Sequence, residues 1–183
     1  MKQLIVFSDA HGRRDIFPYL EEMYPDSPKI YLGDCQMTRS EVEKYGDQFV
    51  FVLGNCDYNY HLKPKTYDGL HIEYRSSNDL TPEEIVFQYQ GLTFIACHGH
   101  HLYEDDFLYL KAWKADCLLQ GHTHVFKVKQ KEGRYSINPG SCNPYKVREM
   151  EIEGWKRKPS SYCVIQMEYG KILDVLRISC DEL

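Results

Sequence analysis

Two histidines, His122 and His124, follow the short apolar run Cys117-Leu118-Leu119 and the glycine Gly121. Histidine is the commonest side-chain metal ligand, and residues i and i+2 at the end of a strand can point the same way. Two nearby histidines are often only surface residues, so this pair indicates a metal site only if further ligands converge on it.

Four other short apolar runs in the chain also end in side chains that bind metals. The runs at residues 4–7, 30–32, 49–53 and 94–97 lead to Asp9 and His11, to Asp34, to Asn55 and to His98, in that order. In three of the five runs a glycine stands immediately before the ligand, as Gly33, Gly54 and Gly121. In open α/β sheets, functional groups gather outside the carboxyl ends of the strands, where loops converge. We therefore expect the ligands to meet at one such edge.

The full set of candidate metal ligands is Asp9, His11, Asp34, Asn55, His98, His122 and His124. These are too many for one closed tetrahedral site. They fit two divalent ions if one carboxylate, most simply Asp34, bridges the ions and each ion takes four protein ligands. Mixed imidazole and carboxylate ligands favour Mn, Fe, Ni or Zn over Ca, and the lack of a thiolate ligand argues against a structural zinc.

The charge of such a centre indicates its chemistry. Two divalent ions with only Asp9 and Asp34 as anionic ligands keep a charge of about +2, which attracts an anion and acidifies a bridging water. Paired ions can stabilise both the attacking and the leaving oxygen of an in-line displacement. The ligand set therefore predicts hydrolysis of a phosphate ester.

The elements that must position these ligands alternate between strands and helices in the first third of the chain. Apolar runs at residues 4–7, 29–32 and 49–53 predict buried strands. Between them, helical spacing over residues 16–24 and the Ser40-x-x-Glu43 capping-box pattern predict two short helices. The order β-α-β-α-β predicts a parallel sheet.

The rest of the chain consists mainly of predicted hairpins. Turns at Gln90-Gly91, Glu132-Gly133 and Gly170 predict pairing of strands 85–89 with 92–97, 125–131 with 134–137 and 162–169 with 172–178. A helix capped by Asp105 or Asp106 is expected before the strand at 117–119. Residues 57–84, with one strand at 71–74, and the polar, basic residues 143–160 are predicted to be long loops. Without a repeat or a linker, we expect residues 1–183 to form a single domain.

Bulk composition is that of a globular protein. The chain has 183 residues, 43% of them hydrophobic and 27% charged, which suits one compact domain. No apolar run approaches the roughly 20 residues that span a bilayer, and the N-terminus lacks the pattern of a signal peptide. The net charge of -5 argues against a general nucleic-acid surface. Seven cysteines, an odd number without Cys-x-x-Cys spacing, favour a reducing compartment, and we expect a cytoplasmic location.

The order of the ligand motifs resembles that of the calcineurin-like metallophosphoesterases. The matching segments are Asp9-x-His11, Gly33-Asp34, Gly54-Asn55-x-Asp57, His98-Gly99-His100 and Gly121-His122-x-His124, and Asn138-Pro139-Gly140-Ser141 extends the likeness to the small, single-domain phosphodiesterases of that superfamily. The resemblance implies a four-layer α/β/β/α sandwich of two mixed β-sheets packed face to face with helices outside.

The resemblance also implies how the ligands divide between the ions. The first metal would be held by Asp9, His11, Asp34 and His124, and the second by Asp34, Asn55, His98 and His122, with Mn as the favoured metal. A bridging hydroxide would attack phosphorus, and the metals and Asn55 would bind the phosphoryl oxygens.

One position departs from the pattern of the family. Many members have a histidine directly after the asparagine, as a general acid for the leaving group, with the next aspartate orienting it; here these positions are Cys56 and Asp57. A thiol, with an ordinary pKa of about 8.5, is no established substitute for imidazole. The departure predicts a preference for good leaving groups or another acid, for which His100 is the nearest candidate in sequence. The catalytic candidates are therefore Asn55, Cys56, Asp57 and His100, of which Asp57 is expected to support the site rather than to bind metal.

Two functions from different classes fit these observations. The first is a phosphodiesterase that acts on a small or nucleotide-like phosphodiester. The second is a non-catalytic, metal-binding scaffold, because the small retromer subunit of the vacuolar sorting machinery resembles this fold and uses it to bind proteins. The complete ligand set favours the enzyme, since a scaffold is free to lose ligands. The expected partner is a small phosphorylated substrate, and the sequence also allows a homo-oligomer.

Overall fold

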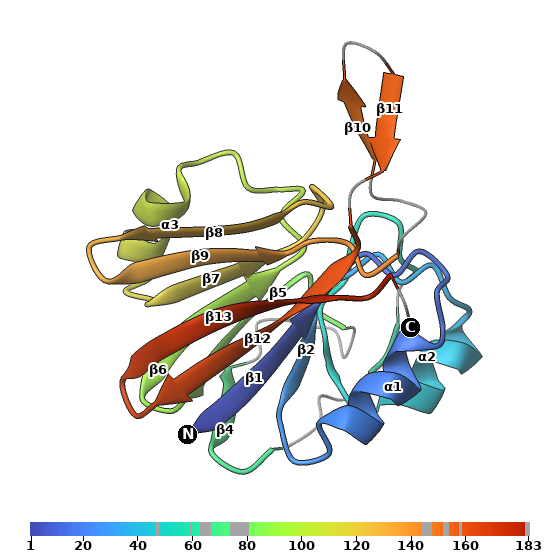
Figure 1. Cartoon of the computed structure of the whole chain (residues 1–183). Coiled ribbons are helices and arrows are strands. Elements are labelled where there is room, and N and C mark those ends of the chain that lie inside the picture. The colour runs from blue at the N-terminus through green and yellow to red at the C-terminus, as the bar shows by residue number, and fades with distance from the viewer. Residues whose placement is uncertain are drawn as a thin grey trace.

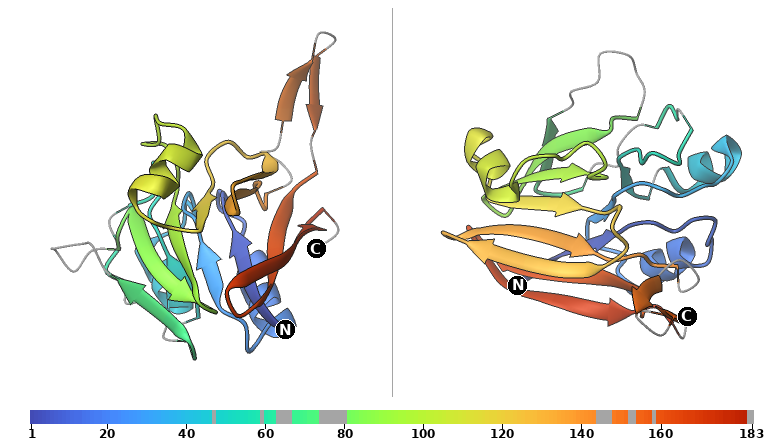
Figure 2. Two further views of the ribbon diagram at one scale, coloured as in Figure 1. Left: turned by 90° about the vertical axis from the view of Figure 1, so that its left-hand side faces the viewer. Right: turned by 90° about the horizontal axis from the view of Figure 1, so that it is seen from above.

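In the computed structural model of the chain, two β-sheets pack face to face and helices cover their outer faces (Figure 1). The turned views show the sheets as adjacent layers (Figure 2). The structure describes residues 1–46, 48–58, 60–62, 67–73, 81–143, 148–151, 154–157 and 159–181. This architecture confirms the predicted four-layer α/β/β/α sandwich of two mixed sheets.

The first sheet has five strands in the order β13-β12-β1-β2-β3. Its strands are β1 (Lys2–Phe7), β2 (Lys29–Tyr31), β3 (Val50–Phe51), β12 (Ser161–Glu168) and β13 (Lys171–Ser179). Strands β1, β2 and β3 are parallel, whereas β12 pairs antiparallel with both β1 and β13. Helices α1 (Ile16–Met23) and α2 (Arg39–Gly46) connect the parallel strands. The predicted β-α-β-α-β order is therefore confirmed.

The second sheet has six strands in the order β4-β5-β6-β7-β9-β8. Its strands are β4 (Leu70–Glu73), β5 (Glu84–Tyr89), β6 (Leu92–Cys97), β7 (Cys117–Gln120), β8 (Phe126–Lys131) and β9 (Arg134–Pro139). Strands β6, β7 and β9 are parallel, and helix α3 (Asp106–Ala112) links β6 to β7. The hairpins β5–β6, β8–β9 and β12–β13 form where the turn residues predicted them.

Strand β1 shows how one sequence serves two layers. Leu4 and Val6 belong to the cluster between the sheets, and Ile5 and Phe7 to the cluster beneath α1 and α2. The split follows from the alternation of side chains along a strand. All four side chains are fully buried, so apolar burial, at about 25 cal/mol per Å², holds both neighbouring layers against β1. On the far side of the second sheet, Leu110 of α3 anchors a smaller cluster.

The prediction of a loop over residues 143–160 is wrong. Strands β10 (Arg148–Glu151) and β11 (Gly154–Arg157) form an antiparallel hairpin that extends away from the two sheets (Figure 1). Each strand has four residues with a single large apolar residue, Met150 or Trp155, which is too short a pattern to predict a strand.

The prediction of the cap of α2 is also wrong, although the helix itself is present. The capping box is Thr38 with Glu41 rather than Ser40 with Glu43: the Thr38 N–H donates to Glu41 Oε2 at 2.8 Å. Both pairs have the same spacing, and the chain uses the earlier one because α2 begins at Arg39. Among the described residues, none of the helices is long and apolar enough to cross a membrane.

Candidate metal centre

Three predicted ligands converge beyond the carboxyl ends of β1 and β7, which belong to different sheets. His11 Nε2 lies 3.1 Å from His124 Nε2, and Asp9 Oδ1 lies 3.2 Å from His124 Nε2 and 3.8 Å from His11 Nε2. Ligand atoms bound at about 2.1 Å to one ion are themselves about 3–3.5 Å apart. The three side chains are therefore arranged around one point that suits a metal ion.

A second group of ligands adjoins the first. Asp34 Oδ2 lies 3.3 Å from His98 Nε2, and Asp9 Oδ1 lies 3.9 Å from the same nitrogen. Asp34 Oδ2 is also 4.0 Å from His11 Nε2. Both carboxylates, Asp9 as well as Asp34, thus lie between the imidazoles of the two groups.

The other two predicted ligands lie at the rim of the centre. The His122 ring is 5.2 Å from the His98 ring, centroid to centroid, and the His122 N–H donates to Asp9 Oδ2. Asn55 is exposed, and its amide nitrogen lies 3.3 Å from Cys56 Sγ. Among the described contacts of Asn55, none reaches another ligand.

Buried polar atoms at this point fit a cation. Asp9 Oδ1 and His98 Nε2 are buried and have no hydrogen-bond partner in the described structure. His98 Nδ1 lies 2.7 Å from the carbonyl oxygen of Leu32, a contact in which Nδ1 carries the proton and Nε2 is left as the ligand atom. An uncompensated buried carboxylate oxygen is costly, so a metal ion suits this donor set.

The ionisation of Asp34 and of His11 suits metal binding. Burial would raise the pKa of Asp34, but the adjacent His98 imidazole and the hydrogen bond from the Cys56 N–H lower it well below its usual value. Burial lowers the pKa of His11. An ionised carboxylate and a neutral imidazole are the forms that bind metals.

The backbone at the centre is strained at most of its ligands. Asp9, His11, Asp34, His122 and His124 all have positive φ, between 44° and 68°. Left-handed backbone conformations of residues other than glycine cluster at functional sites, because the surrounding structure must hold them in place.

The glycines before the ligands are required by close approach of the loops. A Cβ on Gly54 would lie 2.1 Å from Asp34 Oδ1, and a Cβ on Gly121 would lie 2.1 Å from Ser8 Oγ. At Gly33 a Cβ would lie 2.5 Å from the Gly54 nitrogen. The recurring glycine-ligand pattern therefore reflects how closely the ligand loops pack.

Asp57 joins two of these loops. Its Oδ2 accepts the N–H groups of Asp34 at 2.7 Å and Gly54 at 2.9 Å, and its Oδ1 accepts the Cys35 N–H at 2.8 Å. Neighbouring Cys56 is the one exposed cysteine of the seven. Partial desolvation of its sulfur, together with the hydrogen bond and charge of Asp34, raises the pKa of the thiol.

The end of β9 and the residues that follow it support the ligand loops through hydrogen bonds. Asn138 Nδ2 donates to the Gly121 carbonyl, Ser141 Oγ donates to the Asp9 carbonyl at 2.8 Å, and Asn143 Nδ2 donates to the Ala10 carbonyl at 2.9 Å. The sequence analysis missed Asn143. Its acceptor is a backbone carbonyl far away in the chain, and such a contact has no sequence signal.

His100 lies against His101, which is not one of the predicted site residues. Its ring lies 3.8 Å from the ring of His101, centroid to centroid, and 5.5 Å from that of His98. Burial and the charges of the neighbouring imidazoles lower the pKa of His100.

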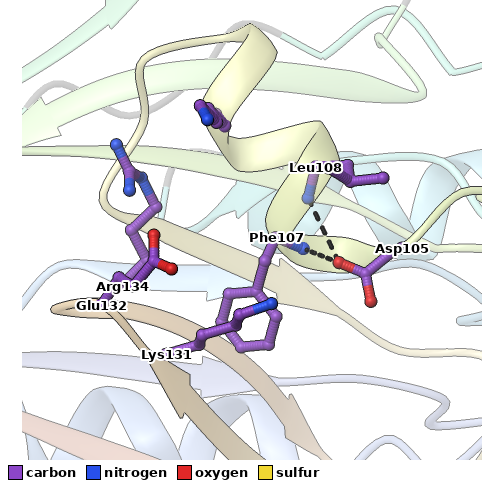
Figure 3. Close-up of a pocket in the computed structure, with 7 residues that line it drawn as sticks. Asp105, Phe107, Leu108, Lys131, Glu132 and Arg134 are labelled. Atoms are coloured by element: carbon purple, nitrogen blue, oxygen red, sulfur yellow. Dashed lines mark hydrogen bonds between the residues drawn. The ribbon is translucent and has the colours of Figure 1, made fainter.

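A recess of about 400 Å³, separate from the metal centre, lies between α3 and the β8–β9 hairpin (Figure 3). Phe107 and the aliphatic part of Lys131 form its wall, and Asp105 accepts the N–H groups of Phe107 and Leu108. None of the predicted site residues lines it, so the site is not there.

Comparison with known proteins places the chain in a family. A model of the calcineurin-like phosphoesterase superfamily domain matches residues 1–169. The chain belongs to this superfamily. The phosphoesterase chain is 27% identical over 189 residues to a probable metallophosphoesterase of Mycoplasma pneumoniae, a match that covers 96% of each chain.

Solved structures share the fold of this phosphoesterase chain. A predicted phosphoesterase of Streptococcus pneumoniae has a TM-score of 0.70 at 20% identity, with 98% of this chain and 90% of that one covered. A novel archaeal phosphodiesterase has a TM-score of 0.62 at 17% identity (96% and 99% covered). Vps29 of Entamoeba histolytica, complexed with Zn²⁺, has a TM-score of 0.61 at 17% identity (98% and 99% covered).

Proposed function

We propose that this phosphoesterase is a dinuclear-metal-dependent phosphodiesterase that hydrolyses small or nucleotide-like phosphodiesters. The observation that carries the proposal is the convergence of Asp9, Asp34 and three imidazoles within 4.0 Å contacts, with buried ligand atoms that lack hydrogen bonds. Mn²⁺ is the favoured metal, and Ni²⁺, Fe²⁺ and Zn²⁺ suit the same ligands. Two ions would supply a nucleophile from water and offset the charge of the phosphoryl oxygens.

The residues of the chain have distinct roles in this proposal. Asp9, His11, Asp34 and His124 hold one ion, and Asp34, Asn55, His98 and His122 hold the other. Asp9 lies between the two groups as Asp34 does, so either carboxylate can reach both ions. Asn55 is exposed at the rim, and its amide group, whose nitrogen also contacts Cys56 Sγ, would donate an N–H to a phosphoryl oxygen.

The position of Cys56 favours diesters with good leaving groups. The Cys56 N–H donates to Asp34 Oδ1 at 2.8 Å, so Cys56 is a neighbour of the carboxylate that would hold the ions, where the phosphate would bind. A thiol is a weak proton donor to an alkoxide compared with an imidazolium. His100 is the alternative acid, 5.5 Å from His98 between ring centroids. A substrate whose leaving group departs without protonation needs neither residue.

A non-catalytic scaffold is the second candidate, and the fold of Vps29 supports it. Vps29 of Entamoeba histolytica was solved as a complex with Zn²⁺, so we expect bound metal from either candidate, and only turnover distinguishes them. A scaffold would bind metal and lack hydrolysis.

The seven free cysteines support the proposal of a reducing, cytoplasmic setting, in which the chain 1–183 acts as one domain on a small substrate.

The deciding experiment is hydrolysis of bis-(p-nitrophenyl) phosphate by metal-stripped protein, with and without Mn²⁺. We expect Mn²⁺-dependent turnover, and we expect the substitution His124→Ala to lower it by at least about 100-fold, since loss of even an outer partner of a ligand costs 10–100-fold. His71→Ala is the matched control, because His71 is exposed on β4 and takes no part in the centre. Full activity of His124→Ala at full metal loading would contradict the ligand assignment, and metal binding without turnover in Mn²⁺, Ni²⁺ or Zn²⁺ would favour the scaffold.

A further inference from the structure

A second group of side chains that can bind metals, Glu83, Glu84, His100 and His101, lies on and beside the loop that carries His98. It lines a recess of about 320 Å³ between the loop 98–102, the start of β5 and α3. The recess contains the carboxylates of Glu83 and Glu84 together with the imidazoles of His100 and His101, and its described lining includes neither lysine nor arginine. His98, a predicted ligand of the first centre, also lines it, so the two sites adjoin. Two carboxylates without a cationic side chain in the same recess attract a cation.

The geometry brings three of these side chains to one point. His101 Nε2 lies 3.5 Å from Glu83 Oε2, and the rings of His100 and His101 are 3.8 Å apart between centroids. One ligand atom from each of the three residues lies within 4.8 Å of the others. Side chains at positions i and i+1 ordinarily diverge, so the convergence of these two imidazoles needs a specific backbone.

That backbone is a tight turn built on Gly99. Gly99 has a φ of +102°, which favours glycine, and the Leu102 N–H donates to the Gly99 carbonyl at 3.1 Å. The turn starts at His98, whose ring is fixed on the Leu32 carbonyl. His100 and His101 are therefore presented by a loop that is held at both ends.

The partners of the neighbouring groups single out Glu83 as the carboxylate ligand. Glu84 accepts the hydroxyl of Tyr109, whereas Glu83 faces His101. His100 Nδ1 is buried and has no hydrogen-bond partner in the described structure. A cation between these side chains would satisfy that nitrogen.

We propose that Glu83, His100 and His101 form an auxiliary divalent-cation site beside the centre at Asp9 and Asp34; when this site is occupied, His100 binds the cation and does not act as the acid. Two imidazoles and one carboxylate suit Zn²⁺ and related borderline cations, and three protein ligands leave a coordination position open toward the recess. The side chains of His101 and Glu83 are 67% and 62% exposed. The site therefore binds more weakly than the buried centre, because ordering exposed side chains costs rotamer entropy.

The test is the number of Zn²⁺ equivalents bound by metal-stripped protein, measured by equilibrium dialysis and elemental analysis over rising free Zn²⁺. We expect His101→Ala and Glu83→Gln each to bind one equivalent fewer than the wild type. The matched controls are His71→Ala and Glu104→Gln, which change exposed residues outside the cluster and are expected to keep every equivalent. In the wild type, the ring NMR signals of His101 should shift as the last equivalent is added.

Three results would overturn the site. They are wild-type stoichiometry in His101→Ala, wild-type stoichiometry in Glu83→Gln, and loss of an equivalent in His71→Ala, which would indicate general binding by surface histidines. The readout is a difference in bound metal between folded variants and involves no hydrolysis. It therefore stands or fails independently of the proposed phosphodiesterase activity.

Discussion

Asp57 stands at a point where one carboxylate organises two ligand loops. Its two oxygens accept backbone N–H groups of Asp34, Cys35 and Gly54. An asparagine at this position has only one oxygen to accept these N–H groups. Its NH₂ group would take the place of the other oxygen and would clash with the N–H donors there, in either orientation of the amide. We expect Asp57→Asn to weaken Mn²⁺ binding by about 10–100-fold, the usual effect of losing an outer partner of a ligand. Titration of metal-stripped protein with Mn²⁺ measures this.

The control for Asp57 is Asp26→Asn, which removes an exposed carboxylate elsewhere and should leave Mn²⁺ affinity unchanged. A purely structural role would lower the stability of the Asp57 variant without changing the affinity of its folded fraction. Unchanged affinity in Asp57→Asn would thus remove this residue from the metal centre.

Sequence reasoning at the residue scale finds groups that follow buried strands and misses groups that bind through the backbone. His98 is predictable because it directly follows the apolar run at 94–97. Ser141 and Asn143 support the loop of Asp9 through carbonyl oxygens more than 130 positions away. A carbonyl is present at every residue and has no sequence signature. The pairing of Glu83 with His101 likewise has no sequence signal, because it depends on how the start of β5 approaches the loop after β6.

At the scale of elements, the carboxyl ends of β2 and β3 approach so closely that a methyl group cannot fit between their loops. A Cβ on Gly54 would lie 2.1 Å from Asp34 Oδ1 and 2.4 Å from the Asp34 nitrogen. We expect Gly54→Ala to push the β3 loop away, to destabilise the fold by about 1–3 kcal/mol and to weaken metal binding. Urea unfolding and Mn²⁺ titration of the same variant measure the two effects.

Gly133→Ala is the matched control for this substitution. Gly133 lies in the β8–β9 turn with open space around its Cβ position, so its replacement meets only the strain of a φ of +78°, about 1–2 kcal/mol, and leaves Mn²⁺ binding intact. If Gly54→Ala bound Mn²⁺ as Gly133→Ala does, close approach of the loops would not be the reason for the glycine.

Elements with a periodic apolar pattern are the ones that sequence predicts. The parallel strands and the three hairpins of the sheets follow from apolar runs and turn residues, because burial imposes both. The β10–β11 hairpin, which extends beyond the sheets, was not predicted because its four-residue strands are too short to show a periodic pattern (Figure 1).

At the scale of the whole molecule, Arg13 lies in the loop after β1, which carries Asp9 and His11. It connects this loop to two segments, one that follows a strand of each sheet. Its guanidinium donates to the carbonyls of Cys142, after β9, and Cys180, after β13, at 2.7 and 2.9 Å. Both acceptor residues are fully buried, so Arg13→Ala leaves two buried carbonyls unsatisfied, and we expect a loss of about 2–4 kcal/mol in the free energy of unfolding. Arg14→Ala is the matched control: the Arg14 side chain is 56% exposed, against 9% for Arg13, and its solvent-screened ion pair with Glu41 adds little to stability. Urea unfolding of both variants tests this prediction. Equal unfolding midpoints for Arg13→Ala and Arg14→Ala would mean that the hydrogen bonds of Arg13 do not hold these segments together.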